Sequence, residues 1–437
     1  MTKRKICEDS KNCTKTNSKN TSKNTILYTS LIEYAPLNEI EYFDNLSNEI
    51  QCNITDELQI LKKIFEVDIP YRIQLMNKNI SIKFKIVALK KINIFEKMDP
   101  LDGEYNKLKK WIECFLSLPF EISKKIPISI DDGYDKCREY MNYCKDILNE
   151  SVYGLNDAKM QIMQIVGQWI SNPKSMGNSI GIKGPMGTGK TTLIKTGMSK
   201  MLNRDFAFIT LGGANDGSFL EGHSYTYEGS HYGKIVDILI QSKSNNPIIF
   251  FDELDKVSES SKGDEIIGIL THLIDTTQNS EFHDKYFSEI DINLSKCLFI
   301  FSYNDESKIN PILKDRMYTI ETNGYTNKDK IIIAKKYLIP SIEKEMNLNS
   351  GEIIISNEII ENIIENYTKE EKGVRNLKRN IEIILSKLNL YKYLSPNTII
   401  FDNKILEIIF PYTLTSEIIN KLLPKQVISN TFLHMYS

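Results

Sequence analysis

The sequence predicts an α/β protein whose parallel β-sheet is flanked along the chain by two mostly helical regions. Between residues 151 and 322, five short apolar segments alternate with amphipathic ones, a pattern typical of parallel strands joined by helices on both faces of a sheet. Apolar residues at helical spacing dominate residues 26–150 and 326–412. The predicted strands are Ile180–Lys183, Phe206–Leu211, Ile248–Phe251, Leu298–Ser302 and Tyr318–Glu321.

Apolar spacing also places the helices and the domain boundaries. Helices are predicted from Ile82 to Phe95, then over Tyr105–Leu118, Gly133–Leu148, Lys328–Leu338, Asn357–Tyr367 and Val374–Tyr393. Two short apolar runs, Ile353–Ile355 and Thr398–Phe401, are expected to pair as a minor hairpin. The predicted organisation is a disordered basic tail at 1–25, a helical region at 26–150, an α/β domain at 151–325, a helical domain at 326–412 and a C-terminal tail at 413–437.

Composition restricts the compartment and the partners. The 437 residues carry a net charge of −2, which provides no overall field to attract nucleic acid. No apolar run reaches membrane-spanning length, and no signal-peptide pattern opens the chain. The seven cysteines are an odd number without zinc-ligand spacing. We therefore expect a cytoplasmic protein, with the nucleus as an alternative, and neither secretion nor membrane insertion.

The segment after the first predicted strand has the pattern of a phosphate-binding loop. Residues 184–191 match G-x-x-x-x-G-K-[ST] in full, between a strand and a helix predicted over Thr192–Met201. Gly184 and Gly189 allow the backbone to curl so that its amides face phosphates. Lys190 supplies a charge for the β- and γ-phosphates, and the Thr191 hydroxyl is a ligand for Mg²⁺. Strand, loop and helix together predict a nucleoside triphosphate site.

Two acids complete this prediction at the end of the apolar strand Ile248–Phe251. Asp252 and Glu253 would emerge at the carboxyl edge of the sheet, where ligands of open α/β sheets bind. Asp252 is expected to hold Mg²⁺, and Glu253 to act as the general base for an attacking water. The alternative is a solvated acidic turn, which the upstream loop disfavours.

Four further residues are weaker candidates when each is considered alone. Asn304 follows a strand and could orient a water, or it could simply form a turn. Arg316 could stabilise charge on a neighbouring subunit's nucleotide, or form a surface ion pair with Asp315 or another acid. Arg375 opens a predicted helix and could reach the nucleotide, or be a solvated helix charge. Tyr227 lies in a polar loop and could contact a ligand or cap a small core.

The order and spacing of these motifs resemble the AAA+ ATPase module of the Lon protease family. The resemblance covers roughly residues 93–412 and extends beyond the nucleotide motifs. The matching segments are Glu104-Tyr105, Trp111, Leu118-Pro119-Phe120, Ser151–Leu155, Ile209–Gly213, Glu221-Gly222-His223, Asn246–Lys256, Asp315-Arg316-Met317, Gly324-Tyr325-Thr326, Tyr367-Thr368 and Gly373–Leu377.

The resemblance implies an AAA+ P-loop sheet with a C-terminal helical lid, and a hexameric ring that uses ATP and Mg²⁺ to grip a polypeptide. It implies ATP binding by Gly184, Pro185, Met186, Gly187, Thr188, Gly189, Lys190, Thr191 and Thr192, a Walker B pair of Asp252 and Glu253, sensor 1 at Asn304, an arginine finger at Arg316, sensor 2 at Arg375 and a pore-loop aromatic at Tyr227.

The sequence also departs from the family. The family's ATPase module is followed by a peptidase domain with a Ser–Lys dyad, and nothing in Thr413–Ser437 has that pattern, so we expect no peptidase activity from this chain. The family's long N-terminal domain is expected to be absent or reduced to residues 26–90. Glu228 replaces an apolar residue of the pore loop, and Glu221 and Asn215 replace arginines. One extra residue near Glu371-Lys372 precedes Gly373 and weakens the Arg375 assignment.

These features favour an ATP-driven protein remodeller. The first alternative is an ATP-binding regulatory or scaffold subunit that acts with a separate ATP-dependent peptidase; the intact set of Lys190, Asp252, Glu253 and Arg316 disfavours it. A second alternative, a nucleic-acid ATPase such as a clamp loader, is disfavoured by the balanced charge. A third is a truncated gene product.

Overall fold

A computed structural model describes residues 23–32, 36–65, 69–173, 179–213, 216–258, 260–349, 351–368, 370–394, 399–400, 403–404 and 411–423. The chain divides into two compact units, Met1–Asn77 and Lys78–Ser437.

The first unit is helical. Tyr28 stacks on Phe43 with ring centroids 4.1 Å apart, and the buried Gln51 side chain donates to the Phe43 carbonyl at 2.8 Å. The Thr25 hydroxyl, also buried, donates to Asp44. Residues 23–25, which the sequence placed in a disordered tail, are helical, because this tertiary contact orders the first helical turn. Residues 1–22 lie outside the described residues. The helices are α2 (Lys23–Leu31), α3 (Leu37–Asp44), α4 (Asn48–Phe65) and α5 (Tyr71–Asn77).

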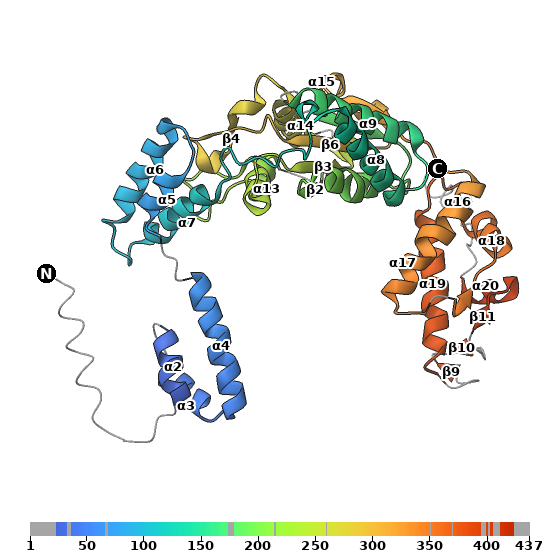
Figure 1. Cartoon of the computed structure of the whole chain (residues 1–437), viewed down its shortest axis with the longest axis horizontal. Coiled ribbons are helices and arrows are strands. Elements are labelled where there is room, and N and C mark those ends of the chain that lie inside the picture. Colours follow the sequence, from blue (N-terminus) through green and yellow to red (C-terminus); the bar gives the residue numbers. More distant parts are fainter. Residues whose placement is uncertain are drawn as a thin grey trace, which may run out of the picture. The chain divides into compact units, whose positions relative to one another are not determined.

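The second unit contains the predicted parallel sheet, which is confirmed. Its five strands have the order β2-β3-β6-β1-β7, and every neighbouring pair is parallel. Because β1 lies between β6 and β7, the loop after β1 and the residue after β6 emerge side by side at the carboxyl edge. The strands are β1 (Ser179–Lys183), β2 (Phe206–Thr210), β3 (Ile248–Asp252), β6 (Leu298–Tyr303) and β7 (Tyr318–Glu321) (Figure 1).

Both faces of the central strands are buried, as an apolar strand sequence without alternation requires. On one face, Ile180, Phe250 and Ile300 belong to a core that includes Leu148 and Val166 from the preceding helices. The opposite face carries residues such as the stacked Phe251 and Phe301, with ring centroids 4.9 Å apart. The helices before the sheet are α6 (Ile82–Phe95), α7 (Gly103–Ser117), α8 (Tyr134–Ser151) and α9 (Asn156–Ser171).

The connections of the sheet carry the remaining elements. The segment after the phosphate-binding loop is helical, as predicted, and consists of α10 (Lys190–Thr192), a π-helical stretch η3 (Leu193–Met198) and α11 (Ser199–Leu202). The other connecting elements are α12 (Ser218–Glu221), α13 (Lys234–Ser242), η4 (Leu254–Lys256), α14 (Ser261–Ile274), η5 (Asn279–Glu281), β4 (Phe282–His283), η6 (Lys285–Phe287), β5 (Asp291–Ile292), η7 (Glu306–Lys308) and α15 (Pro311–Asp315).

The C-terminal helices gather around a core of their own (Figure 1). Ile342, Ile360 and Ile381 are completely buried in it. Ile419 joins them, so the predicted C-terminal tail contributes to this core. The elements are α16 (Asn327–Ile333), η8 (Ala334–Leu338), α17 (Ile339–Glu345), β8 (Ile353–Ile354), α18 (Asn357–Tyr367), α19 (Arg375–Tyr391), β9 (Ile399–Ile400), β10 (Asn403–Lys404), β11 (Tyr412–Thr413) and α20 (Ser416–Leu422).

The predicted minor hairpin is wrong. Strand β8 pairs in parallel with β11, whereas β9 pairs in antiparallel fashion with β10. Two-residue strands carry too few alternating positions to specify a partner, so the pairing follows the packing of α18, α19 and α20.

Candidate nucleotide site

The loop after β1 adopts the tight conformation that its glycines predict. Gly187 and Gly189 have φ values of +75° and +88°, where other residues are strained. A Cβ on Gly187 would lie 3.0 Å from the backbone nitrogen of Arg375, and one on Gly189 would lie 3.1 Å from the Val152 side chain. The glycines therefore allow both the turn and the close approach of two other segments.

Lys190 is held at the centre of this loop. Its buried ammonium group donates to the carbonyls of Gly184 (2.5 Å) and Pro185 (3.1 Å) and to Oδ1 of Asn304 (2.9 Å). Burial lowers its pKa, against the attraction of Asp252. Because the three hydrogen-bond partners of this cation are uncharged, it retains a strong affinity for an anion that displaces them.

The two acids after β3 face the same cavity but differ in their contacts. Asp252 accepts hydrogen bonds from the Ser302 hydroxyl and, at 3.1 Å, from the Glu253 backbone nitrogen. Glu253 has a left-handed backbone (φ +61°) and pairs with Lys256 at 2.5 Å, which raises the pKa of Lys256. A Cβ built on Gly212 would lie only 2.2 Å from the other carboxylate oxygen of Glu253. A non-glycine residue at 212 would therefore displace the Glu253 side chain.

Asn304 follows β6 and joins the site through its side chain. The Asn304 backbone nitrogen donates to the Asp255 carboxylate at 3.2 Å. Because Asp255 belongs to η4, this turn helps to orient Asn304, whose side chain accepts from Lys190. The structure thus brings Asn304 to the predicted cluster, which spacing along the chain could not show.

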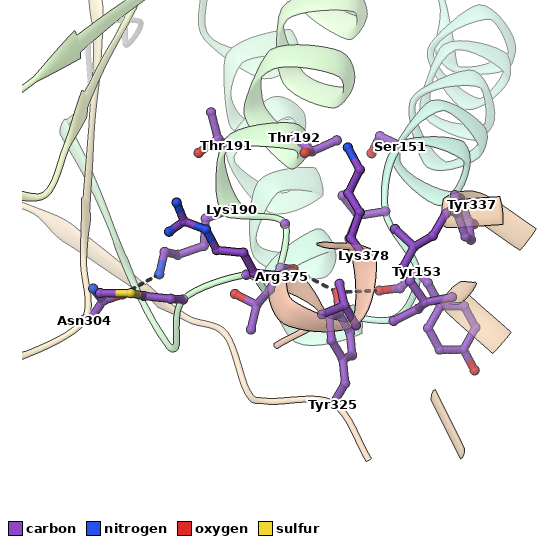
Figure 2. Close-up of a pocket in the computed structure, with 18 of the residues that line it drawn as sticks. Ser151, Tyr153, Lys190, Thr191, Thr192, Asn304, Tyr325, Tyr337, Arg375 and Lys378 are labelled. Atoms are coloured by element: carbon purple, nitrogen blue, oxygen red, sulfur yellow. Dashed lines mark hydrogen bonds between the residues drawn. The ribbon is translucent and has the colours of Figure 1, made fainter. Parts of the chain in front are cut away.

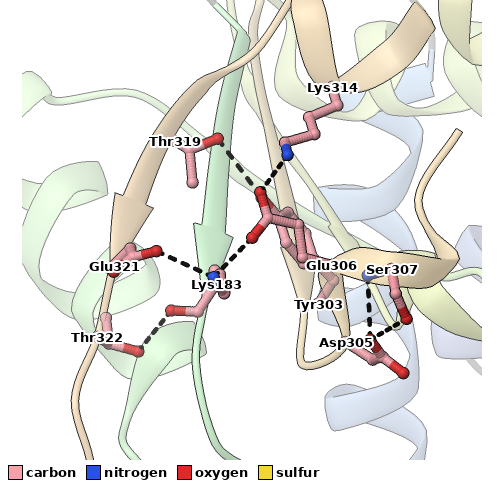
Figure 3. Close-up of polar contacts among 9 residues, drawn as sticks. All are labelled: Lys183, Tyr303, Asp305, Glu306, Ser307, Lys314, Thr319, Glu321 and Thr322. Carbon is pink, nitrogen blue, oxygen red and sulfur yellow. Dashed lines mark hydrogen bonds and ion pairs between the residues drawn. The ribbon is translucent and has the colours of Figure 1, made fainter. Parts of the chain in front are cut away.

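Glu306 ties this turn to two other segments (Figure 3). Its carboxylate accepts from Lys183 and from Lys314, both at 2.6 Å, and the hydrogen bonds to these lysines lower the pKa of Glu306 to about 2. Lys183 ends β1 immediately before the phosphate-binding loop, and Lys314 lies two residues before Arg316. One carboxylate therefore connects the Asn304 turn, the start of the loop and the helix that leads to Arg316.

The helical domain closes the other side of the site. The Val374 backbone nitrogen donates to the Gly187 carbonyl at 3.1 Å. The hydroxyl of Tyr325 lies 2.8 Å from the Thr188 carbonyl and 3.2 Å from that of Tyr153, and burial raises its pKa. These bonds join the phosphate-binding loop directly to Tyr325, just before the helical domain, and to Val374, just before α19.

Together these segments enclose a cavity of about 440 Å³, within the range of small-molecule sites (Figure 2). Figure 2 shows Lys190 and Asn304 at one end and the aromatic rings of Tyr153 and Tyr337 at the other. Cations and oxygen ligands at one end, with apolar rings at the other, fit a nucleotide with phosphates and a base. The lining residues are Ser151, Val152, Tyr153, Met186, Gly187, Thr188, Gly189, Lys190, Thr191, Thr192, Asp252, Glu253, Asn304, Tyr325, Ile333, Tyr337, Leu338, Val374, Arg375 and Lys378.

Four predicted residues lie outside this lining: Gly184, Pro185, Tyr227 and Arg316. Gly184 and Pro185 instead contact the site through their carbonyls, which accept from Lys190. Arg316 forms an ion pair with Asp275 at 3.1 Å, so within the single chain it makes the surface pair that was its alternative. Tyr227 is 67% exposed and caps no core.

Sequence reasoning missed the rings and one cation of the cavity. Tyr153 and Tyr325 belong to segments that carried the family resemblance, but neither was assigned a role. Tyr337 and Lys378 lie on helices in which no local pattern distinguishes them from other surface residues. The i, i+3 spacing of Lys378 from Arg375 on α19 was the one available signal for Lys378.

Comparison with known proteins agrees with this geometry. Residues 180–325 match the family model "ATPase family associated with various cellular activities (AAA)". With the fold described above, this match defines the class: the chain contains an AAA ATPase-family domain. Residues 344–395 match the model "Lon protease AAA+ ATPase lid domain". The chain therefore carries an AAA+ module of the Lon protease family.

Individual relatives support the same family. A Lon protease homolog of Acanthamoeba polyphaga mimivirus is 37% identical in an alignment of 366 residues that covers 80% of this chain and 36% of the relative. A mitochondrial Lon protease homolog of Scheffersomyces stipitis is 35% identical, over 68% of this chain and 26% of its own length. The Lon protease of Cytophaga hutchinsonii is 35% identical, over 72% of this chain and 37% of its own length. The match thus spans between about a quarter and somewhat more than a third of the length of these relatives.

Among the described residues, none forms a helix with the length and hydrophobicity needed to cross a bilayer.

Proposed function

We propose that this chain couples ATP hydrolysis to the unfolding or remodelling of a polypeptide. One observation carries the proposal: a single cavity gathers Lys190, Asp252, Glu253, Asn304 and Arg375 from four separate segments of the chain. A nucleotide-binding scaffold needs the loop and its lysine, whereas a base and additional polar groups around the phosphates are needed for hydrolysis.

The proposed roles follow from the chemistry of each side chain. Thr191 and Asp252 offer hydroxyl and carboxylate oxygens, which fit Mg²⁺, and that ion would neutralise phosphate charge when bound. Glu253 accepts a proton from the attacking water while the oxygen of that water forms a bond to the γ-phosphorus. The bond from that phosphorus to the bridging oxygen breaks, and ADP and phosphate leave. Asn304 and Arg375 orient the water and stabilise charge on the phosphate oxygens.

The lid contacts support coupling of hydrolysis to movement. Arg375 lines the cavity, and the backbone nitrogen of the neighbouring Val374 donates to the Gly187 carbonyl. Loss of the γ-phosphate would therefore act on the first turn of α19. The proposal is that loss of the γ-phosphate changes the angle between the lid and the sheet, and that this movement displaces the loop that carries Tyr227.

A hexameric ring is the proposed assembly. Arg316 is partly exposed, with 37% of its side chain accessible, and its intrachain partner is a single carboxylate, Asp275. In the proposed ring, Arg316 exchanges Asp275 for the nucleotide of the adjacent subunit, where a guanidinium stabilises transition-state charge.

The proposed polypeptide contact is the loop of residues 223–231, here named the substrate loop. Its exposed aromatic, Tyr227, offers a large apolar surface for any side chain. Glu221 precedes this loop and pairs with Lys285 at 3.4 Å, so the exposed Glu228 carries most of the acidity expected for the loop.

We also propose that these 437 residues catalyse no peptide-bond hydrolysis, because Thr413–Ser437 lack a serine and lysine in the pattern of a Ser–Lys dyad. A separate ATP-dependent peptidase is the proposed additional partner. The alternative function, an ATP-binding regulatory or scaffold subunit for such a peptidase, predicts nucleotide binding without polypeptide-stimulated turnover.

Tyr227→Ala tests the remodelling function. Casein, an unstructured polypeptide, is expected to stimulate phosphate release by the wild-type protein and to remain intact on a gel. The variant is expected to lose about tenfold in apparent affinity for casein, because a buried aromatic contact contributes roughly 1–2 kcal/mol. Tyr227→Phe, which retains the ring, is the control. Casein that fails to stimulate the wild type refutes remodelling and favours the scaffold function.

Glu306→Gln tests the link between the Asn304 turn and its neighbours. We expect kcat for ATP to fall about threefold to tenfold with little change in KM, because a neutral amide cannot anchor two ammonium groups and small displacements of catalytic groups are costly. Steady-state phosphate release measures both parameters. Glu321→Gln, which removes only the second partner of Lys183 (3.0 Å), is the matched control. Equal kcat values in the two variants contradict the positioning role of Glu306.

A further inference from the structure

We propose that Tyr225 is the positioning residue of the substrate loop and that the helices α6 and α7 hold it through two lysines. The inference rests on the proposed function, because it explains how Tyr227 is presented to a polypeptide. It assigns a role to α6 and α7, on which the sequence placed no candidate functional residue.

Two cations contact the ring of Tyr225. Lys91, on α6, places its ammonium group 4.9 Å from the centroid of the Tyr225 ring, and Lys107, on α7, places its own 4.7 Å away. Lys91 also lies 4.6 Å from the Trp111 ring, so it bridges two aromatic side chains. All these distances are within the range of an attractive cation–π contact. Two residues further along the loop, Tyr227 is 67% exposed, so the two tyrosines have different surroundings.

An aromatic turn holds Tyr225 as well. Its ring meets Tyr286, which is fully buried, edge to face with centroids 5.5 Å apart. The adjacent Phe287 contacts Trp111 of α7 at 5.5 Å. Helix α7, the turn η6 and the substrate loop therefore share one aromatic cluster, in which Tyr225 is the loop's contribution.

The same turn anchors the far end of the loop. The buried Asp284 carboxylate accepts from the backbone nitrogens of Gly233 and Tyr286, both at 2.8 Å. Gly233 lies two residues after the substrate loop and is the N-cap of α13. Tyr225 and Gly233 thus fasten two points of the chain to η6, on either side of Tyr227.

Backbone hydrogen bonds transmit this anchoring to the exposed tip. Tyr227 donates its backbone N–H to Ser224 (3.1 Å), and Ser230 donates to the Tyr227 carbonyl (3.3 Å). At the base, His223 donates to the His231 carbonyl (3.1 Å). Because the tip is a closed turn, fixing the Tyr225 ring fixes the direction in which Tyr227 leaves the loop. This lowers the entropy lost when a polypeptide binds.

The experiment replaces both lysines with an uncharged side chain of similar length. In the full chain, Lys91→Met with Lys107→Met is expected to raise the casein concentration for half-maximal ATPase stimulation about fivefold, since two cation–π contacts are lost. Basal ATPase is expected to stay within about twofold of the wild type, because neither lysine lines the nucleotide cavity. Hydrogen exchange of the amides of residues 224–230 is expected to accelerate about threefold or more.

Matched variants separate positioning from general damage. Lys90→Met replaces an exposed lysine of the same helix and is expected to behave as the wild type. Tyr225→Phe retains the ring and is expected to preserve both casein response and exchange rates, whereas Tyr225→Leu is expected to match the double lysine variant.

The outcomes distinguish this inference from the proposed function. A double variant with wild-type casein response and wild-type exchange in the loop overturns the inference alone. A wild-type protein that shows no response to casein overturns the proposed function and the positioning role of Tyr225 together. Accelerated exchange with a raised half-maximal casein concentration, both reproduced by Tyr225→Leu but not by Lys90→Met, supports the inference.

Discussion

Glu253→Gln is expected to reduce ATP hydrolysis by a factor of roughly 10² or more while ATP still binds. The amide has the size of the carboxylate but cannot accept a proton from the attacking water. The substitution also breaks the 2.5 Å ion pair with Lys256, and Lys190 and Thr191 are untouched. Phosphate release measures turnover, and fluorescence of a labelled ATP analogue measures binding.

The same variant tests the proposed assembly. Because bound ATP is not consumed, the nucleotide-dependent contact of Arg316 with a neighbouring subunit persists, so mass measurement with Mg²⁺-ATP is expected to show more hexamer than for the wild type. Glu289→Gln, at an exposed glutamate outside the cavity lining, is the control for charge. Unchanged turnover in Glu253→Gln would falsify the role of Glu253 as the base.

Lys190→Met is expected to weaken ATP binding by about two orders of magnitude, which corresponds to roughly 2.7 kcal/mol. The ammonium group is the cation inside the loop, and the carbonyls of Gly184 and Pro185 that now face it lose their donor. Without the ammonium group, the partial negative charges of these carbonyl oxygens would repel the negatively charged phosphates. Titration with the labelled ATP analogue measures the loss.

The pH dependence of binding provides a second measurement on Lys190. Burial lowers its pKa, so the positive charge is present at low pH and is lost as pH rises through that lowered value. As pH rises, the ATP affinity of the wild type is therefore expected to fall at a pH below the one at which an exposed lysine loses its proton. The Lys190→Met variant is expected to lack this fall in affinity. Lys195→Met, at an exposed lysine five residues further on, should bind ATP as the wild type does. An equal loss in both variants contradicts a specific role for Lys190.

Local patterns were sufficient where function depends on neighbours in sequence. The phosphate-binding loop needs its glycines, lysine and threonine within eight residues, and a buried strand needs a continuous apolar run before Asp252. Both patterns predicted the observed elements, and the alternation of strands and helices predicted the parallel sheet. The order of the strands was not predictable, and it is this order that places Asn304 beside Lys190.

Failures occurred where the partner of a segment is distant in the chain. The pairing of β8 with β11 joins residues nearly sixty positions apart, and no feature of either two-residue strand encodes the other. The role of Tyr325 was equally unpredictable, because its hydroxyl meets the carbonyls of Thr188 and Tyr153 only after distant segments of the chain have folded together.

The sequence by itself determined the nucleotide loop, the acids after β3 and the class of sheet, because spacing within a few residues encodes backbone geometry and side-chain chemistry together. Only the tertiary structure decided which distant groups share the cavity and how Tyr225 is held. Contacts such as Lys91 to Tyr225 and Val374 to Gly187 form between segments far apart in sequence, and their geometry depends on packing of the whole unit.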